Sequence, residues 1–176
     1  MGAKIKDLKF TEAGGSATEI VAISEVKDYL QIEGTGYDGP IAIFITAARQ
    51  MIEQLCSVSL MEKVAVAFIF SSKAEPFKLP FYPVESITQI QWKKCPSTWV
   101  TLTGDDYCTY GENNVYIESS EIGLHKITYV LGVSDLSVWR QAIQAQAAFM
   151  FNNRDAKPGT VAPEVMALIQ PFYTYS

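Results

Sequence analysis

The spacing of apolar residues changes twice along this chain, from a helical period to a strand period and back. One helical face is marked between residues 41 and 55 by Ile41, Phe44, Ile45, Ala48, Ile52 and Leu55. Segments rich in β-formers then follow, such as residues 63–70 (KVAVAFIF) and the alternating residues 86–93 (SITQIQWK). Helical spacing returns at Leu136, Trp139, Ile143, Ala147 and Met150. The pattern predicts an α+β fold, mainly a helical bundle with a central antiparallel β insertion at about residues 60–131.

Signals at helix ends predict two helices before the insertion and two after it. Ser24 is placed to cap the first helix, and Asp38 to cap the second, with Pro40 in its first turn. Pro163 opens the last helix. Because both long helices present one apolar face, we expect a shared core of Phe44, Ile45, Ile52, Trp139, Ile143 and Met150.

The first twenty residues differ from the rest because they show no apolar period. They mix charged and small polar residues with the pair Gly14-Gly15, which favours a flexible N-terminal arm over residues 1–20. The total length of 176 residues suits one core. We therefore expect residues 21–176 to form a single domain.

Charge and cysteine content narrow the classes of function. The chain has 14 basic and 19 acidic residues, a net charge of −5, which disfavours sequence-independent gripping of DNA phosphates. The three cysteines include no close pair, so buried thiols in a reducing cytoplasm are favoured over a disulfide framework or a zinc ribbon. No apolar stretch reaches the roughly 20 residues that a membrane span needs, so we expect no membrane association.

Residues suited to catalysis do not form a recognisable constellation. The single histidine, His125, lies in the alternating segment LHKITYVL, where a plain strand residue is the simplest interpretation. The carboxylates Asp105, Asp106 and those of residues 118–121 fall at expected turns and fit solvated loops. The glycines form no phosphate loop. We expect no catalytic, cofactor-binding or metal-binding residues, and hence no enzyme.

Two aromatic clusters are candidates for contact with a partner. Phe172, Tyr173 and Tyr175 end the chain, where exposed rings favour a protein interface; the alternative is that they fold back on the chain's own core. The second cluster, residues 92–99, places Lys93 and Lys94 between two tryptophans. It could stack on nucleic-acid bases, but the acidic balance favours Trp92 as a sheet anchor and the lysines as the end of a loop.

Three blocks of sequence, taken in order, resemble the tailed-phage head–tail connector (adaptor, or head-completion) family. The first is IVAISEVKDYLQIEG followed by DGPIAIFITAARQMIEQLC, and the second is FKLPFYPVESITQIQW. The third is a late helix that ends in NNRDA before VAPEVMALIQPFY. Together they cover roughly residues 20–175; the Gly-rich N-terminal segment and the aromatic middle depart from the family's pattern.

The resemblance implies a structural role in the virion neck, after synthesis in the host cytoplasm. Such proteins form a ring of about a dozen copies that docks under the portal protein and receives a stopper or tail-completion protein. Genomic DNA passes through the ring's channel without specific binding. The alternative hypothesis is a phage nucleic-acid-binding accessory protein, which would show a basic stripe and salt-sensitive affinity.

Overall fold

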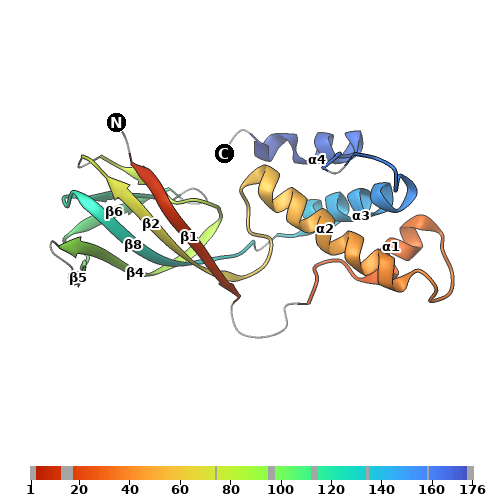
Figure 1. Ribbon diagram of the computed structural model, residues 1–176, viewed down its shortest axis with the longest axis horizontal. Helices are drawn as coiled ribbons and strands as arrows, with labels where there is room; N and C mark the ends of the chain where they lie inside the picture. The colour runs from red at the N-terminus through yellow and green to blue at the C-terminus, as the bar shows by residue number, and fades with distance from the viewer. Residues whose placement is uncertain are drawn as a thin grey trace. The chain divides into compact units, whose positions relative to one another are not determined.

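The computed structural model describes residues 3–12, 18–73, 75–94, 98–111, 115–133, 135–157 and 159–173. The fold is α+β, with two N-terminal helices, two C-terminal helices and antiparallel sheets between them, as the sequence predicts (Figure 1). The helices are α1 (Ile23–Leu30), α2 (Asp38–Cys56), α3 (Ser137–Asn152) and α4 (Pro163–Tyr173). The strands are β1 (Lys4–Glu12), β2 (Lys63–Ser71), β3 (Phe77–Lys78), β4 (Val84–Lys94), β5 (Thr98–Thr101), β6 (Tyr107–Tyr110), β7 (Tyr116–Ser119) and β8 (Gly123–Leu131).

The chain divides into two compact units. One unit, Met1–Ser16 with Met61–Val133, contains the strands; the other, Ala17–Leu60 with Ser134–Ser176, contains the helices. The expected β insertion at about residues 60–131 therefore corresponds to most of the β unit. The expected single domain over residues 21–176 divides at this insertion, because the strands and the helices bury separate sets of apolar side chains.

The helical unit is centred on α2 and α3, which lie side by side (Figure 1). Four alanines of α3 are buried, at positions 142, 145, 147 and 148, and such small side chains allow close approach of neighbouring helices. Within the expected shared core, Ile45, Ile52, Trp139 and Ile143 are buried. Phe44 and Met150 are half-buried instead, and the Phe44 ring meets that of Phe151 at 6.4 Å.

The starts of α1 and α2 differ by one or two residues from the sequence prediction. Ala22, not Ser24, is the N-cap of α1, and its backbone N–H donates to the Glu25 carboxylate at 2.7 Å. Tyr37 is the N-cap of α2, so Asp38 is the first helical residue. The Asp38 carboxylate instead accepts a hydrogen bond from Lys27 Nζ at 2.8 Å, which ties α2 to α1.

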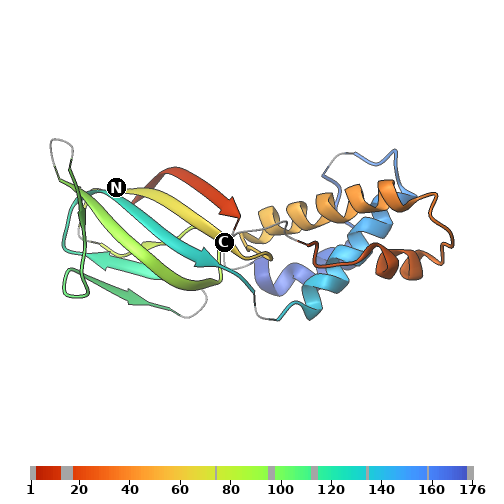
Figure 2. The same ribbon diagram turned by 90° about the horizontal axis from the view of Figure 1, so that it is seen from below.

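The β unit contains a five-stranded sheet, in the order β1-β2-β8-β4-β5, and a three-stranded sheet, β3-β7-β6 (Figure 2). Their common core includes Ala67 and Ile69 of β2, Ile127 and Tyr129 of β8, and Ile117 of β7. The Tyr129 hydroxyl donates to the Pro80 carbonyl at 2.6 Å, so this buried polar group keeps a partner. Strands β6 and β7 pair antiparallel, with Tyr110 opposite Tyr116.

The N-terminal segment corrects the sequence prediction. Lys4–Glu12 was expected to be part of a flexible arm but forms β1, an edge strand that pairs antiparallel with β2. Leu8 lies opposite Ala67 and packs against the core of the β unit, and the Phe10 ring meets the Phe81 ring edge-on at 5.2 Å. The remainder of the expected arm includes residues 13–17, which lie outside the described part of the chain.

Candidate functional site

Among the side chains suited to acid–base or nucleophilic chemistry, His125 and Cys56 are buried. Cys108 of β6 is exposed, which corrects the expectation that the thiols are buried. His125 lies on the core side of β8, 5.3 Å from the Phe77 ring, and burial lowers the pKa of its imidazole. Cys56 ends α2, and burial raises the pKa of its thiol to about 11. Neither residue is placed to meet a substrate from solvent. Across the described ranges, no group of three or more His, Cys, Asp or Glu side chains could hold a metal ion.

Among the predicted partner residues at the C-terminus, Phe172 is the one whose side-chain packing is described. The Phe172 ring lies 4.6 Å from the Trp139 ring and is half-buried. Val165 and Ile169, on the same helix, are fully buried. The apolar face of α4 therefore packs within its own unit, which is the alternative that the sequence left open. Tyr173 ends α4, and Tyr175 lies outside the described residues.

A buried ion-pair network near the end of α2 is a feature that sequence reasoning missed. Arg49 lies between Glu53, at 2.9 Å, and Glu19, at 2.8 Å. Burial by itself would lower the pKa of Arg49, but the two carboxylates raise it overall. Glu53 also accepts the backbone N–H of Leu60 at 2.9 Å. The network links Glu19, where the chain enters the helical unit, to Leu60, where the chain leaves it. Its role is therefore structural.

Several large apolar side chains of the helical unit are exposed. Ile43 of α2 is 69% exposed, and Tyr29 of α1 and Tyr37, the N-cap of α2, are also exposed. The Tyr37 ring meets the Phe151 ring edge-on at 5.4 Å.

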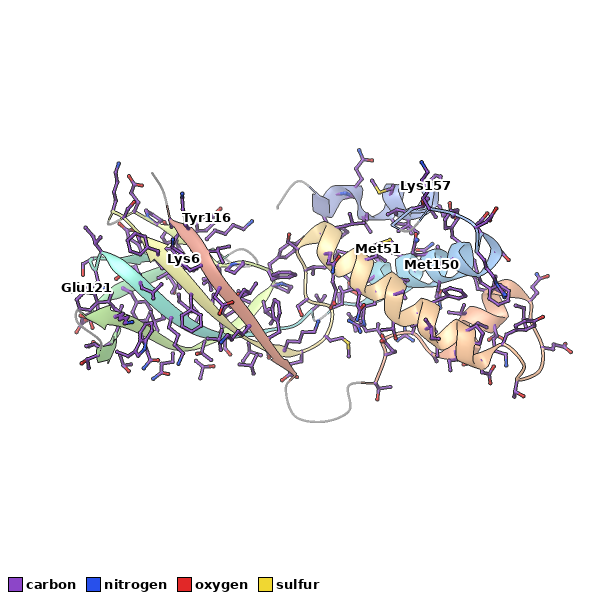
Figure 3. The ribbon with its side chains drawn as sticks, viewed as in Figure 1. Lys6, Met51, Tyr116, Glu121, Met150 and Lys157 are labelled. Carbon is purple, nitrogen blue, oxygen red and sulfur yellow. The ribbon has the colours of Figure 1, made fainter. Side chains whose placement is uncertain are left out.

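The open face of the five-stranded sheet combines aromatic rings with lysines. Strand alternation puts Ala67 and Ile69 toward the core and Phe68 and Phe70 on the other side. Lysine ammonium groups lie over these rings: Lys9 over Phe68 at 5.9 Å and Lys6 over Phe70 at 5.6 Å. Figure 3 shows Lys6 on β1. We name this surface the lysine face, and it contains Lys4, Lys6, Lys9, Lys93, Lys126, Phe68, Phe70 and Trp99.

The residues of the predicted Trp–Lys cluster lie on opposite sides of the five-stranded sheet. Trp92 packs against the core and donates its indole N–H to the Ile122 carbonyl at 3.1 Å, as expected for a sheet anchor. Lys93 points to the other side, where its ammonium lies 5.9 Å from the centre of the Trp99 ring. Lys93 and Trp99 are directly opposite each other in register, on β4 and β5. The side chain of Lys94 lies outside the described part of the chain.

In the described residues, no helix is both long and apolar enough to span a membrane.

Comparison with known proteins identifies the fold. No family model matches the sequence, and no curated protein matches it. Solved structures do match, and they are chains of assembled particles. One is a chain of the neck of an empty GTA (gene transfer agent) particle computed with C6 symmetry: TM-score 0.71, 16% identity, 93% of this chain and 94% of that chain covered.

Two further structures agree over nearly the same length. A chain in the virion of a native gene transfer agent particle has a TM-score of 0.69 at 19% identity, covering 93% of this chain and 94% of that one. A chain in the neck of the native particle, computed with C12 symmetry, has a TM-score of 0.65 at 16% identity, covering 90% and 94%. At these identities the likeness establishes a shared fold.

Proposed function

We propose that this protein is a structural subunit of the neck of a tailed-phage-like virion. In this role a ring of about a dozen copies docks on the portal protein and extends the DNA channel toward a stopper or tail-completion protein. The observation that carries the proposal is the fold shared with two neck chains, over 93% and 90% of the sequence. The three blocks that resemble head–tail connectors lie in the same part of the chain and support it independently.

Ring formation is supported by the symmetry of the similar structures. Two of them are necks computed with C6 and C12 symmetry. A closed ring joins two different patches of neighbouring subunits. The exposed residues Tyr29, Tyr37 and Ile43 offer apolar surface for one such patch.

A non-enzymatic role agrees with the positions of His125 and Cys56. His125 and Cys56 are buried, and burial shifts both pKa values in the direction that keeps the side chain uncharged. A cysteine nucleophile needs the opposite shift, toward the thiolate. We propose that both residues are structural and that the protein uses no cofactor or metal.

The ring proposal is tested by mixing the purified protein with the portal protein of the same particle. Mass photometry of each protein and of the mixture measures how many copies bind. We expect the portal mass to increase by about a dozen subunits, and electron microscopy to show an added tier. A portal that gains no mass across the accessible concentrations would contradict the proposal.

The C-terminal residues Phe172, Tyr173 and Tyr175 are proposed to attach the ring to the portal or the stopper. Because Phe172 packs on Trp139, we assign the contact itself mainly to Tyr173 and Tyr175 and regard Phe172 as the anchor of the tail. Tyrosine suits this role because its ring offers contact area while its hydroxyl keeps a hydrogen bond.

The tail proposal is tested with the double variant Tyr173→Ala/Tyr175→Ala. We expect an unchanged melting temperature and at least about tenfold weaker binding to the portal or the stopper, since buried tyrosines are common binding hot spots. Met166→Ala is the matched control, because Met166 is an exposed apolar residue of the same helix. Unchanged affinity of the double variant for both partners would contradict the proposal.

A nucleic-acid-binding accessory protein is the second candidate function, and the lysine face is the observation that favours it. Such a protein would bind DNA at physiological salt and would not associate with the portal. The mass measurement therefore separates the two candidates.

A further inference from the structure

The lysine face concentrates positive charge on a protein whose net charge is −5. Register places its members together: Lys4 lies opposite Phe70, and Lys126 lies opposite Phe68 on one side and Gln91 on the other. Asp7 is the acidic residue in the same register, opposite Phe68, and its carboxylate lies 3.7 Å from Lys9. Five lysines against this one aspartate leave the described face strongly basic.

The rings beneath the lysines position their ammonium groups. Each of three lysines has an aromatic ring within 6 Å of its ammonium nitrogen, an arrangement that holds the cation by its attraction to the ring face. The aliphatic stems cover part of each ring, and the charged ends remain at the surface. Lys6, Lys9 and Lys93 are all exposed. The result is a set of ammonium groups on a rigid sheet, open to an anionic partner.

We propose that the lysine face binds the phosphate backbone of nucleic acid, weakly and without sequence preference. Lysine ammonium groups are compact charges that suit single phosphate oxygens, and phosphate contacts of this kind carry no sequence information. Because cations already cover the rings, the face favours phosphate contact over stacking of bases. The inference goes beyond a structural ring and does not depend on one, because the surface belongs to a single subunit.

Weak binding follows from the small number of contacts. Each phosphate neutralised on duplex DNA contributes about −0.9 to the slope of log K against log salt, and about −0.7 on single strands. Five lysines therefore predict a slope no steeper than about −4.5 on duplex DNA. We expect binding that is measurable at low salt and nearly lost at physiological salt, which lets DNA slide past the face.

The test uses the full-length protein and fluorescence anisotropy with a labelled mixed-sequence duplex of about 20 base pairs, from about 25 to 150 mM salt. The test variant is Lys9→Gln/Lys93→Gln/Lys126→Gln. The control variant, Lys78→Gln/Arg154→Gln/Lys157→Gln, makes the same change in net charge; Lys78 lies in the three-stranded sheet and the other two lie in the helical unit. Figure 3 shows Lys157 in the helical unit. Melting temperatures establish that both variants are folded.

We expect the test variant to bind about tenfold more weakly or worse at low salt and to lose about 2–3 units of salt slope, while the control keeps the wild-type slope. A single-stranded oligonucleotide, used in parallel, shows which form of nucleic acid supplies the phosphates. Equal losses in both variants would overturn the proposal, because net charge would then explain binding. Unchanged binding of the test variant would also overturn it, and would mean that the lysines only cover the rings.

An acidic polypeptide is the other polyanion that a basic face could accept. Poly-L-glutamate is therefore included as a competitor. If it displaces the duplex at equal charge concentration, the face is a general polyanion surface and the nucleic-acid assignment is wrong. These measurements use no portal protein, so a negative DNA-binding result would not contradict the ring proposal. A negative portal-binding result would likewise not contradict DNA binding by the lysine face.

Discussion

At the scale of single residues, His125 makes the folding stability of the β unit depend on pH. Burial lowers its folded-state pKa below the ordinary value of 6.5, so the unfolded chain takes up a proton at a higher pH than the folded chain does. Stability is therefore unaffected well above pH 6.5 and falls as the pH drops below it, by at most about 1.4 kcal/mol per pH unit for one proton. His125 is the single histidine, so no other side chain ordinarily titrates in this range.

We predict that His125→Phe removes part of this pH dependence. Phenylalanine fits an apolar site beside Phe77 and cannot be protonated. The free energy of unfolding, measured in urea at about pH 7.5 and about pH 5.5, should fall less in the variant than in the wild type. An equal fall in both proteins would show that carboxylates alone set the pH dependence.

Ile52 is the residue on which the helical core can best be tested. It is fully buried on α2, so Ile52→Ala should cost about 2–5 kcal/mol of unfolding free energy, because it removes apolar contacts and leaves a cavity. Ile43→Ala on the same helix is the matched control: Ile43 is exposed, so we expect a change within about 0.5 kcal/mol. Similar losses in both variants would mean that the face assigned to the core is wrong.

At the scale of elements, we expect β1 to stabilise the β unit by covering the edge of β2. Deleting residues 2–12 would leave β2 as an edge strand with unpaired backbone groups and would remove the Phe10–Phe81 contact. We predict a loss of thermal stability and increased aggregation. A deletion of Gly2 and Ala3 alone, which precede β1, should be neutral. Unchanged stability without β1 would mean that the strand adds little to the β unit.

At the scale of the whole molecule, the two units should respond separately to core mutations. Ile127 is buried in the β unit and Ile52 in the helical unit. We predict that Ile127→Ala reduces hydrogen-exchange protection mainly in residues 61–133, whereas Ile52→Ala reduces it mainly in residues 17–60 and 134–173, because local openings follow the core they expose. Equal losses across both units for either variant would show that the chain unfolds as one.

The sequence by itself determined the type and order of nearly all elements. Helical and strand periods are local properties, so residues 41–55 and 86–93 indicate their structures without reference to any partner. Helix boundaries depend on a few side chains at each end, which the period does not specify. Glu25 reaches back to Ala22, and Ser24 lies inside the helix. The short segment Lys4–Glu12 shows no apolar period in the sequence and forms a strand because β2 offers it a partner.

Only the tertiary structure decided which distant residues share a surface. The lysine face joins residues of β1, β2, β4, β5 and β8, and their meeting depends on strand order and register. The Phe172–Trp139 contact and the Arg49–Glu19 ion pair likewise join residues far apart in the sequence. The physical reason is that a periodic pattern specifies which face of an element is apolar, whereas pairing and packing, which are non-local, choose what each face meets.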